Sequence, residues 1–139
     1  MGSRLNPYLM LPGTAREAVT FYASVFGGEV QVSTFGEFGL AGDGVDPEGV
    51  MHAQLQTPAG YTLMLSDLPP GTDPAPPGGA VTICLSGDDT EQLRGYFARL
   101  SEGGTVSVPL TAQVWGDEYG QVTDRFGVEW MVNIATGGP

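Results

Sequence analysis

The chain has 139 residues, 41% of them hydrophobic, which is enough to bury the core of one globular domain. It carries 16 acidic residues against five basic ones, all arginine, and its net charge is −11. This balance argues against nucleic acid and anionic membranes as partners, because both select a basic protein face. It allows a cationic ligand, although an acidic surface also serves solubility.

The sequence has no apolar run approaching the roughly 18 residues of a membrane-spanning helix. Its first residues lack the apolar core of a secretory signal. The single cysteine, Cys84, lies in the apolar run VTICLS and cannot form an internal disulfide. We therefore expect a buried thiol in a protein of the reducing cytoplasm.

The first half of the chain predicts one helix among four strands. The expected elements are a strand at 5–11, a helix at 15–26 and strands at 29–35, 50–57 and 61–66. Thr14 and Glu17 have the spacing of a capping box at the start of the helix. The acidic, glycine-rich segment 36–49 predicts a mobile surface loop, and Phe35 and Phe38, which flank it, could form a lid.

The second half follows a Pro/Gly-rich linker at 68–80 and predicts the same order of elements. The expected elements are a strand at 81–85, a helix to about residue 100 and strands at about 105–114, 119–123 and 128–134. Asp88 or Asp89 caps the helix, and Pro109 marks a sheet edge or a bulge. The composition of DRFG predicts a turn, so we assign Asp124 and Arg125 a structural role.

The two halves also match residue by residue, which indicates an internal repeat. The matched pairs are Gly13 with Gly87, Glu17 with Glu91, Tyr22 with Tyr96, Gln54 with Gln121, Gly60 with Gly127 and Met64 with Met131. We predict a single α+β domain at 1–139 with a first βαβββ module at 5–67 and a second at 81–135. Two such modules can form a curved mixed sheet, a half-barrel cup with both helices on its outer face.

Three segments carry a resemblance to a known family. They are NPYLMLPG, EAVTFYASVFGGEV and WGDEYGQVTDRFGVEWMVN. Together they resemble the PhnB-like branch of the vicinal oxygen chelate superfamily, which includes glyoxalase I, extradiol dioxygenases, and fosfomycin and bleomycin resistance proteins. The resemblance extends from Asn6 to Ile134 and implies the cup-shaped fold and commonly a homodimer. It implies no single reaction, because a fold does not fix a function.

Metal-dependent members of this superfamily carry one His, Gln or Glu on the first strand of each module and one Glu on the last. Aligned through Gly13, the four positions fall on other residue types. These residues are Pro7, Met64, Val81 and Met131. None of them suits a hard divalent cation, so we expect no metal at the family site and no cofactor. A metal held by a different set of residues is the disfavoured alternative.

Strand alternation predicts which side chains line the cup. The residues placed there are His52, Gln54, Gln56, Thr62, Met64, Ser66, Tyr119, Gln121, Thr123, Glu129, Met131 and Asn133. Met51, Ala53 and Leu55 alternate with the first three and should pack on the helix. Trp115 is expected to stack on a ligand or to plug the mouth of the cup.

His52 and Glu129 are the candidate acid and base residues. Each has a simpler interpretation. His52 can be a hydrogen-bonded pocket residue, and Glu129 can be an exposed glutamate on an edge strand. Gln54 and Gln121 could pair with each other across the pseudo-twofold axis.

These residues leave three functional hypotheses. The first is a metal-free protein that binds a small molecule in the manner of bleomycin resistance proteins. The second is an enzyme, either a lyase, isomerase or dioxygenase with a non-standard metal site, or a metal-free acid/base catalyst using His52 and Glu129. The third is a dimeric interaction module without a ligand. We expect a homodimer because a half-open cup leaves apolar edges exposed.

Overall fold

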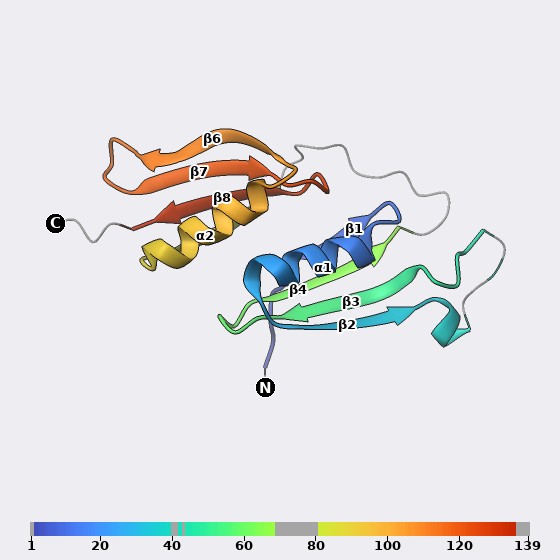
Figure 1. Cartoon of the computed structure of the whole chain (residues 1–139). Helices are drawn as coiled ribbons and strands as arrows, with labels where there is room; N and C mark the ends of the chain where they lie inside the picture. The colour runs from blue at the N-terminus through green and yellow to red at the C-terminus, as the bar shows by residue number, and fades with distance from the viewer. Residues whose placement is uncertain (1, 40–41, 43, 69–80, 136–139) are drawn as a thin grey trace. The chain divides into compact units, whose positions relative to one another are not determined.

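A computed structural model describes residues 2–39, 42, 44–68 and 81–135 (Figure 1). The chain divides into two compact units, Met1–Pro74 and Ala75–Pro139. Most of the expected linker at 68–80 lies outside the described residues. None of the described helices is long and apolar enough to cross a membrane.

The first module contains one helix, a short 3-10 turn and four strands. In chain order they are β1 (Tyr8–Leu11), α1 (Ala15–Phe26), β2 (Glu29–Thr34), η1 (Gly36–Phe38), β3 (Val50–Gln56) and β4 (Thr62–Asp67). The sheet has the order β1-β4-β3-β2. β1 runs parallel to β4, and the other neighbours are antiparallel.

The second module repeats this topology. Its elements are β5 (Ile83–Gly87), α2 (Thr90–Ser101), β6 (Thr105–Ala112), β7 (Glu118–Thr123) and β8 (Glu129–Ile134). The sheet has the order β5-β8-β7-β6, again with one parallel pair. In each module the helix lies across one face of its own sheet (Figure 1). The predicted α+β fold of tandem βαβββ modules is confirmed.

Each helix buries an apolar stripe against alternate residues of its sheet. In the first module Val19 and Tyr22 of α1 are fully buried, as are Ala53 and Leu55 of β3. In the second module Trp130 of β8 is the largest fully buried side chain. Because strand residues alternate between faces, the residues between these core positions must lie on the face away from the helix.

The two modules also share a close approach between the backbone after the helix and a neighbouring strand. A Cβ atom on Gly28 would lie 2.1 Å from the carbonyl oxygen of Gln56, and one on Gly104 would lie 2.3 Å from that of Thr123. Only glycine allows so close an approach of two chain segments. Each glycine lies between the helix and the next strand, at equivalent places in the two modules.

The cap of α1 differs from the prediction. Thr14 makes no side-chain hydrogen bond to the helix. Instead, the Ala15 amide donates to Asp67 Oδ1 at 2.9 Å, and the Val50 amide donates to Asp67 Oδ2 at 2.8 Å. A carboxylate at the end of β4 therefore replaces the local capping box. In α2, by contrast, Asp89 accepts from the Gln92 amide as a local cap.

One side-chain assignment on β3 was wrong. Val50 is buried in the core, whereas Met51 is only half-buried. Thr34 pairs with Val50 and Ser33 with His52, so Met51 is an extra residue in a β-bulge. The bulge changes the alternation at the start of β3, while His52, Ala53, Gln54 and Leu55 keep their predicted faces.

The first strand of each module begins later than predicted. β1 starts at Tyr8 and β5 at Ile83, and Val81 is 80% exposed. Cys84 is exposed rather than buried, because it lies on the face of β5 away from the core. Pro109 lies in β6, an edge strand with irregular register, as predicted. The side chain of Phe38 lies outside the described residues, so the lid remains a prediction.

Candidate functional site

The face of the first sheet opposite α1 brings together residues from three strands. Tyr8 and Gln54 are both Cα partners of Met64, so the three form one row across β1, β4 and β3. The Tyr8 side chain extends from this row toward His52. Its hydroxyl lies 3.3 Å from His52 Nδ1, and the two ring centroids are 5.8 Å apart. Tyr8 was not predicted as a site residue, although its alternation with Leu9 on the strand was a signal.

Two polar groups on this face are left available. His52 and Gln54 are half-buried on alternate positions of β3. Among the described residues, neither His52 Nε2 nor the Gln54 side-chain amide has a hydrogen-bond partner. Their strand neighbours Ser33, Gln31 and Met64 are uncharged. The face thus offers an imidazole nitrogen and an amide beside aromatic and thioether surface.

The equivalent face of the second sheet is bonded within itself. Gln121 Nε2 donates to the Tyr119 hydroxyl at 2.6 Å. The Trp115 ring meets Tyr119 edge-on, with centroids 6.1 Å apart, and is 59% exposed. Asn133 Nδ2 donates to Asp117 Oδ2 at 3.0 Å, which ties β8 to the turn that carries Trp115. The result is a pre-formed aromatic and amide surface.

Glu129 lies on the same face at the start of β8. The strand sits between β5 and β7, so the interpretation of Glu129 as an edge-strand residue was wrong. The Thr82 hydroxyl donates to Glu129 Oε1 at 3.2 Å. Beside this contact is a cavity of about 40 Å³, also lined by Gln121, which has room for roughly one water molecule.

The contacts of Asp124 and Arg125 confirm the structural role predicted for them. Asp124 is only 3% exposed and accepts hydrogen bonds from the amides of Phe126 and Val128 and from Trp130 Nε1. Arg125 donates twice to the carbonyl oxygen of Glu102. These contacts fix the turn between β7 and β8 and the core indole, and they lie away from the polar face.

An ion pair anchors the start of β7 to α2. The Arg94 guanidinium donates through two nitrogens to the Glu118 carboxylate. This hydrogen bond holds the pKa of Glu118 below its ordinary value and raises that of Arg94. The pair lies next to Tyr119 in sequence, so it helps hold the end of β7 that carries the aromatic surface.

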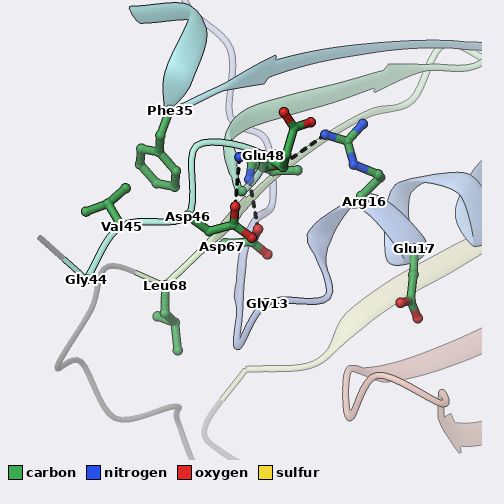
Figure 2. A pocket seen from close by; sticks show the side chains of 12 residues that line it. Gly13, Arg16, Glu17, Phe35, Gly44, Val45, Asp46, Glu48, Asp67 and Leu68 are labelled. Atoms are coloured by element: carbon green, nitrogen blue, oxygen red, sulfur yellow. Dashed lines mark hydrogen bonds between the residues drawn. The ribbon is translucent and has the colours of Figure 1, made fainter. Parts of the chain in front are cut away.

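A second hollow lies elsewhere in the first module, at the start of α1 (Figure 2). It has a volume of about 400 Å³ and contains none of the predicted site residues. Its polar groups are largely engaged in local structure. Asp67 accepts the two amides of its capping role, Asp46 accepts from the Glu48 amide, and Arg16 donates to the Glu48 carbonyl. We therefore attribute this hollow to the way the acidic loop packs beside the start of α1.

With these features in place, comparison with known proteins identifies the family. The model of the Glyoxalase/Bleomycin resistance protein/Dioxygenase superfamily matches residues 4–132. The chain belongs to this superfamily.

Its relatives within the superfamily include Protein YjdN of Escherichia coli strain K12. YjdN is 30% identical over 141 residues, which cover 94% of each chain. The uncharacterized protein Mb0911c of Mycobacterium bovis is 35% identical over 136 residues, covering 92% of this chain and 80% of the relative.

Solved structures of the superfamily agree with this fold. Protein PA1353 from Pseudomonas aeruginosa has a TM-score of 0.79 and 34% identity, covering 96% of this chain and 98% of that one. A PhnB protein from Bacillus cereus, described as a putative 3-demethylubiquinone-9 3-methyltransferase, has a TM-score of 0.77 and 26% identity. It covers 96% of this chain and all of its own.

The sheet registers show which residues lie opposite Met64 and Met131. In the register of the parallel pairs, Tyr8 is the partner of Met64 and Cys84 is the partner of Met131. Pro7 and Val81, which the glycine alignment selected, precede β1 and β5. Desolvation raises the pKa of the Cys84 thiol, so its thiolate is not favoured. The described residues contain no group of three or more His, Cys, Asp or Glu that could hold a metal ion.

Proposed function

We propose that this chain is a metal-free small-molecule-binding protein of the glyoxalase/bleomycin resistance type. The proposal rests on one observation. In both modules, the sheet face away from the helix carries aromatic, thioether and amide side chains, and its carboxylates Glu29 and Glu129 lie at the first residues of β2 and β8. Binding sites for small molecules typically combine such apolar surface with a few polar groups that fix orientation.

The chemistry of the family positions supports the metal-free part of this proposal. The positions expected from the sequence are Pro7, Met64, Val81 and Met131, and the strand residues in register with the two methionines are Tyr8 and Cys84. Hard divalent cations select carboxylate and carbonyl oxygens, and imidazole is a ligand of borderline ions such as Zn, Ni and Fe. A metal at these positions would therefore lack its preferred donors.

The aromatic residues suggest the shape of the ligand. Trp115 and Tyr119 present an edge-to-face pair, which can contact a planar ring. The net charge of −11 also raises the local concentration of cations around the protein. Planar aromatic compounds, both neutral and cationic, are therefore the first to test.

A thermal-shift screen of such compounds tests the proposal. A compound present at 100 times its Kd should stabilise the protein by about 3 kcal/mol. Trp115→Ala should weaken this stabilisation, whereas Val114→Ala, at a fully exposed neighbouring position, should not. Elemental analysis of protein purified without chelators and offered Ni, Zn, Mn and Fe(II) should find no stoichiometric metal. Stoichiometric metal, or turnover of a substrate without any stabilising ligand, would contradict the proposal.

A second candidate function is catalysis. The Tyr8 hydroxyl beside His52 Nδ1 resembles the pairing of a base with the group that orients it. In this alternative His52 and Glu129 act as acid and base, or a non-standard metal site supports lyase, isomerase or dioxygenase chemistry. His52→Ala should then abolish turnover while the far-UV circular dichroism spectrum stays unchanged. Unchanged turnover would exclude the acid/base form.

We further propose a homodimer in a reducing, cytoplasmic setting. β1 is an edge strand with Met10 50% exposed, and such an apolar edge is suited to burial by a second copy. A single accessible thiol is compatible with a reducing compartment. Sedimentation at micromolar concentration should give a dimer. A dimer that gains stability from no small molecule would instead support an interaction module without a ligand.

A further inference from the structure

The polar faces of the two modules differ in what they leave unpaired. In the second module Gln121, Asn133 and Glu129 each have a side-chain partner. In the first module His52 Nε2 and the Gln54 amide have none among the described residues. These two side chains share one face at alternate strand positions, about 7 Å apart along β3.

Tyr8 determines what His52 presents to a ligand. A neutral imidazole carries a single N–H, and the hydrogen bond at one ring nitrogen selects which nitrogen is protonated. A phenol is a better donor than acceptor, so we expect the Tyr8 hydroxyl to donate to Nδ1, which lies 3.3 Å away. The proton of His52 then resides on Nε2. His52 therefore offers a directed N–H donor beside the Gln54 amide, which can both donate and accept.

The surroundings restrict what can accept this hydrogen bond. The direct sheet partners of His52 and Gln54 are the uncharged residues Ser33, Gln31 and Met64. Glu29 lies on the same face but pairs with Gln56, at the end of β3 away from His52, so an ammonium group bound at His52 would have no carboxylate among these direct partners. The net charge of −11 disfavours an anion. Tyr8 and Met64 supply aromatic and thioether surface in the same row.

Building on the proposed binding function, we infer that the first module recognises the carbonyl oxygen of an uncharged aromatic compound. His52 Nε2–H donates to this oxygen, and Gln54 pairs with the adjoining amide or hydroxyl of the same compound. Tyr8 is a positioning residue, since it acts by fixing the tautomer of His52. The aromatic ring of the compound lies against Tyr8 and Met64.

The first test reads the tautomer directly. His52 is the only histidine of the chain, so ¹⁵N-histidine labelling gives signals from this residue alone. At a pH where the imidazole is neutral, the proton should reside on Nε2, with Nδ1 showing the shift of a hydrogen-bond acceptor. Tyr8→Phe should remove that shift of Nδ1. Tyr61→Phe, which deletes a phenol in the turn after β3, should leave it. A proton on Nδ1 in the wild type would overturn the inference.

The second test distinguishes the ligand class with three related probes. Benzamide, benzylamine and benzoate carry a neutral carbonyl, a cation and an anion on the same ring. At millimolar concentration, benzamide should shift the Nε2–H resonance of His52, and the other two should do so far less. An equal or larger effect of benzylamine or benzoate would overturn the inference, as would no effect of benzamide.

Two substitutions of His52 add a matched control. The amide nitrogen of glutamine can occupy the place of Nε2, whereas that of asparagine reaches only the place of Nδ1. His52→Gln should therefore keep benzamide binding close to the wild type, and His52→Asn should weaken it about fivefold, the value of one neutral hydrogen bond. Equal binding by the wild type and His52→Asn would contradict the inference. Circular dichroism checks that both variants fold.

The two proposals fail in different ways. A compound that stabilises the wild type and His52→Asn equally leaves the binding function standing and overturns the carbonyl recognition. If no compound in the aromatic screen stabilises the wild type, the binding function fails and the inference built on it fails as well.

Discussion

The two modules share one backbone plan but use their polar faces differently. The close approaches at Gly28 and Gly104 are nearly identical, and both sheets have the same strand order. On the polar face, however, the first module leaves His52 and Gln54 available, whereas the second satisfies Gln121 through Tyr119. A repeated module can therefore keep the same core between helix and sheet while the opposite sheet face differs. In one module this face has polar groups available to a ligand, and in the other these groups are bonded to each other.

The strongest way to break the shared plan is to add a Cβ at its crowded glycines. Gly28→Ala and Gly104→Ala should each cost roughly 3 kcal/mol of unfolding free energy, because the new atom would overlap a carbonyl oxygen that belongs to the sheet. Urea denaturation measures the loss. Gly60→Ala is the control, since it changes a glycine of positive φ with no atom within 4 Å, and should cost about 1–2 kcal/mol. Equal losses at Gly28 and Gly60 would show that the close approach is not limiting.

The turns after β3 and β7 should differ in strength. Thr57 Oγ1 accepts one hydrogen bond from the Tyr61 amide, whereas Asp124 accepts three, one of them from the buried Trp130 indole. Thr57→Ala should therefore cost about 1 kcal/mol and Asp124→Ala about 3 kcal/mol. Thermal or urea unfolding compares them. A similar cost for both would mean that the indole contact adds little.

Ligand binding should depend more on Gln54 than on Gln121. For an aromatic compound that raises the Tm, Gln54→Leu should lower affinity about fivefold, because its amide is free to bind. Gln121→Leu should lower it about twofold, because that amide nitrogen already donates to Tyr119. Isothermal titration calorimetry measures both. The reverse order would assign recognition to the second module.

The smallest effect should come from the pair at the start of β7. The hydrogen bond from Arg94 lowers the pKa of Glu118, so the stabilisation is present above the ordinary glutamate value of 4.5 and is lost as the pH falls through the folded pKa. Glu118→Gln should therefore lower the Tm slightly at neutral pH and leave it unchanged in stronger acid. Melting curves across this range measure the difference. A Tm difference that persists in acid would assign the effect to packing. The first module has no such pair on β3 within the described residues.

Much of this fold was predictable because its signals are local. The helical spacing of Val19 and Tyr22, the alternation of His52 with Ala53, and the glycines after each helix all act within a few residues. The Asp89 cap is local as well. The repeated order of these signals was sufficient to predict two βαβββ modules.

The missed features depend on residues that meet only after the sheet forms. Asp67 caps α1 from 52 residues away, and Tyr8 reaches His52 across 44 residues. Both contacts require β1 to lie beside β4, and no local pattern encodes that neighbourhood. The bulge at Met51 similarly depends on its pairing with β2. The candidate site was therefore predicted as a set of strand residues, while its partner Tyr8 was not.

The carboxylate of Asp67 has a mechanical consequence. Asp67 is the last residue of β4, and its two carboxylate oxygens accept hydrogen bonds from the first residues of α1 and β3. The next amide, that of Leu68, donates to the carbonyl of Leu11 at the end of β1. A pull along the chain from the second module thus reaches three strands and a helix at once. Because β4 lies between β1 and β3, such a force would be divided between both of its neighbours.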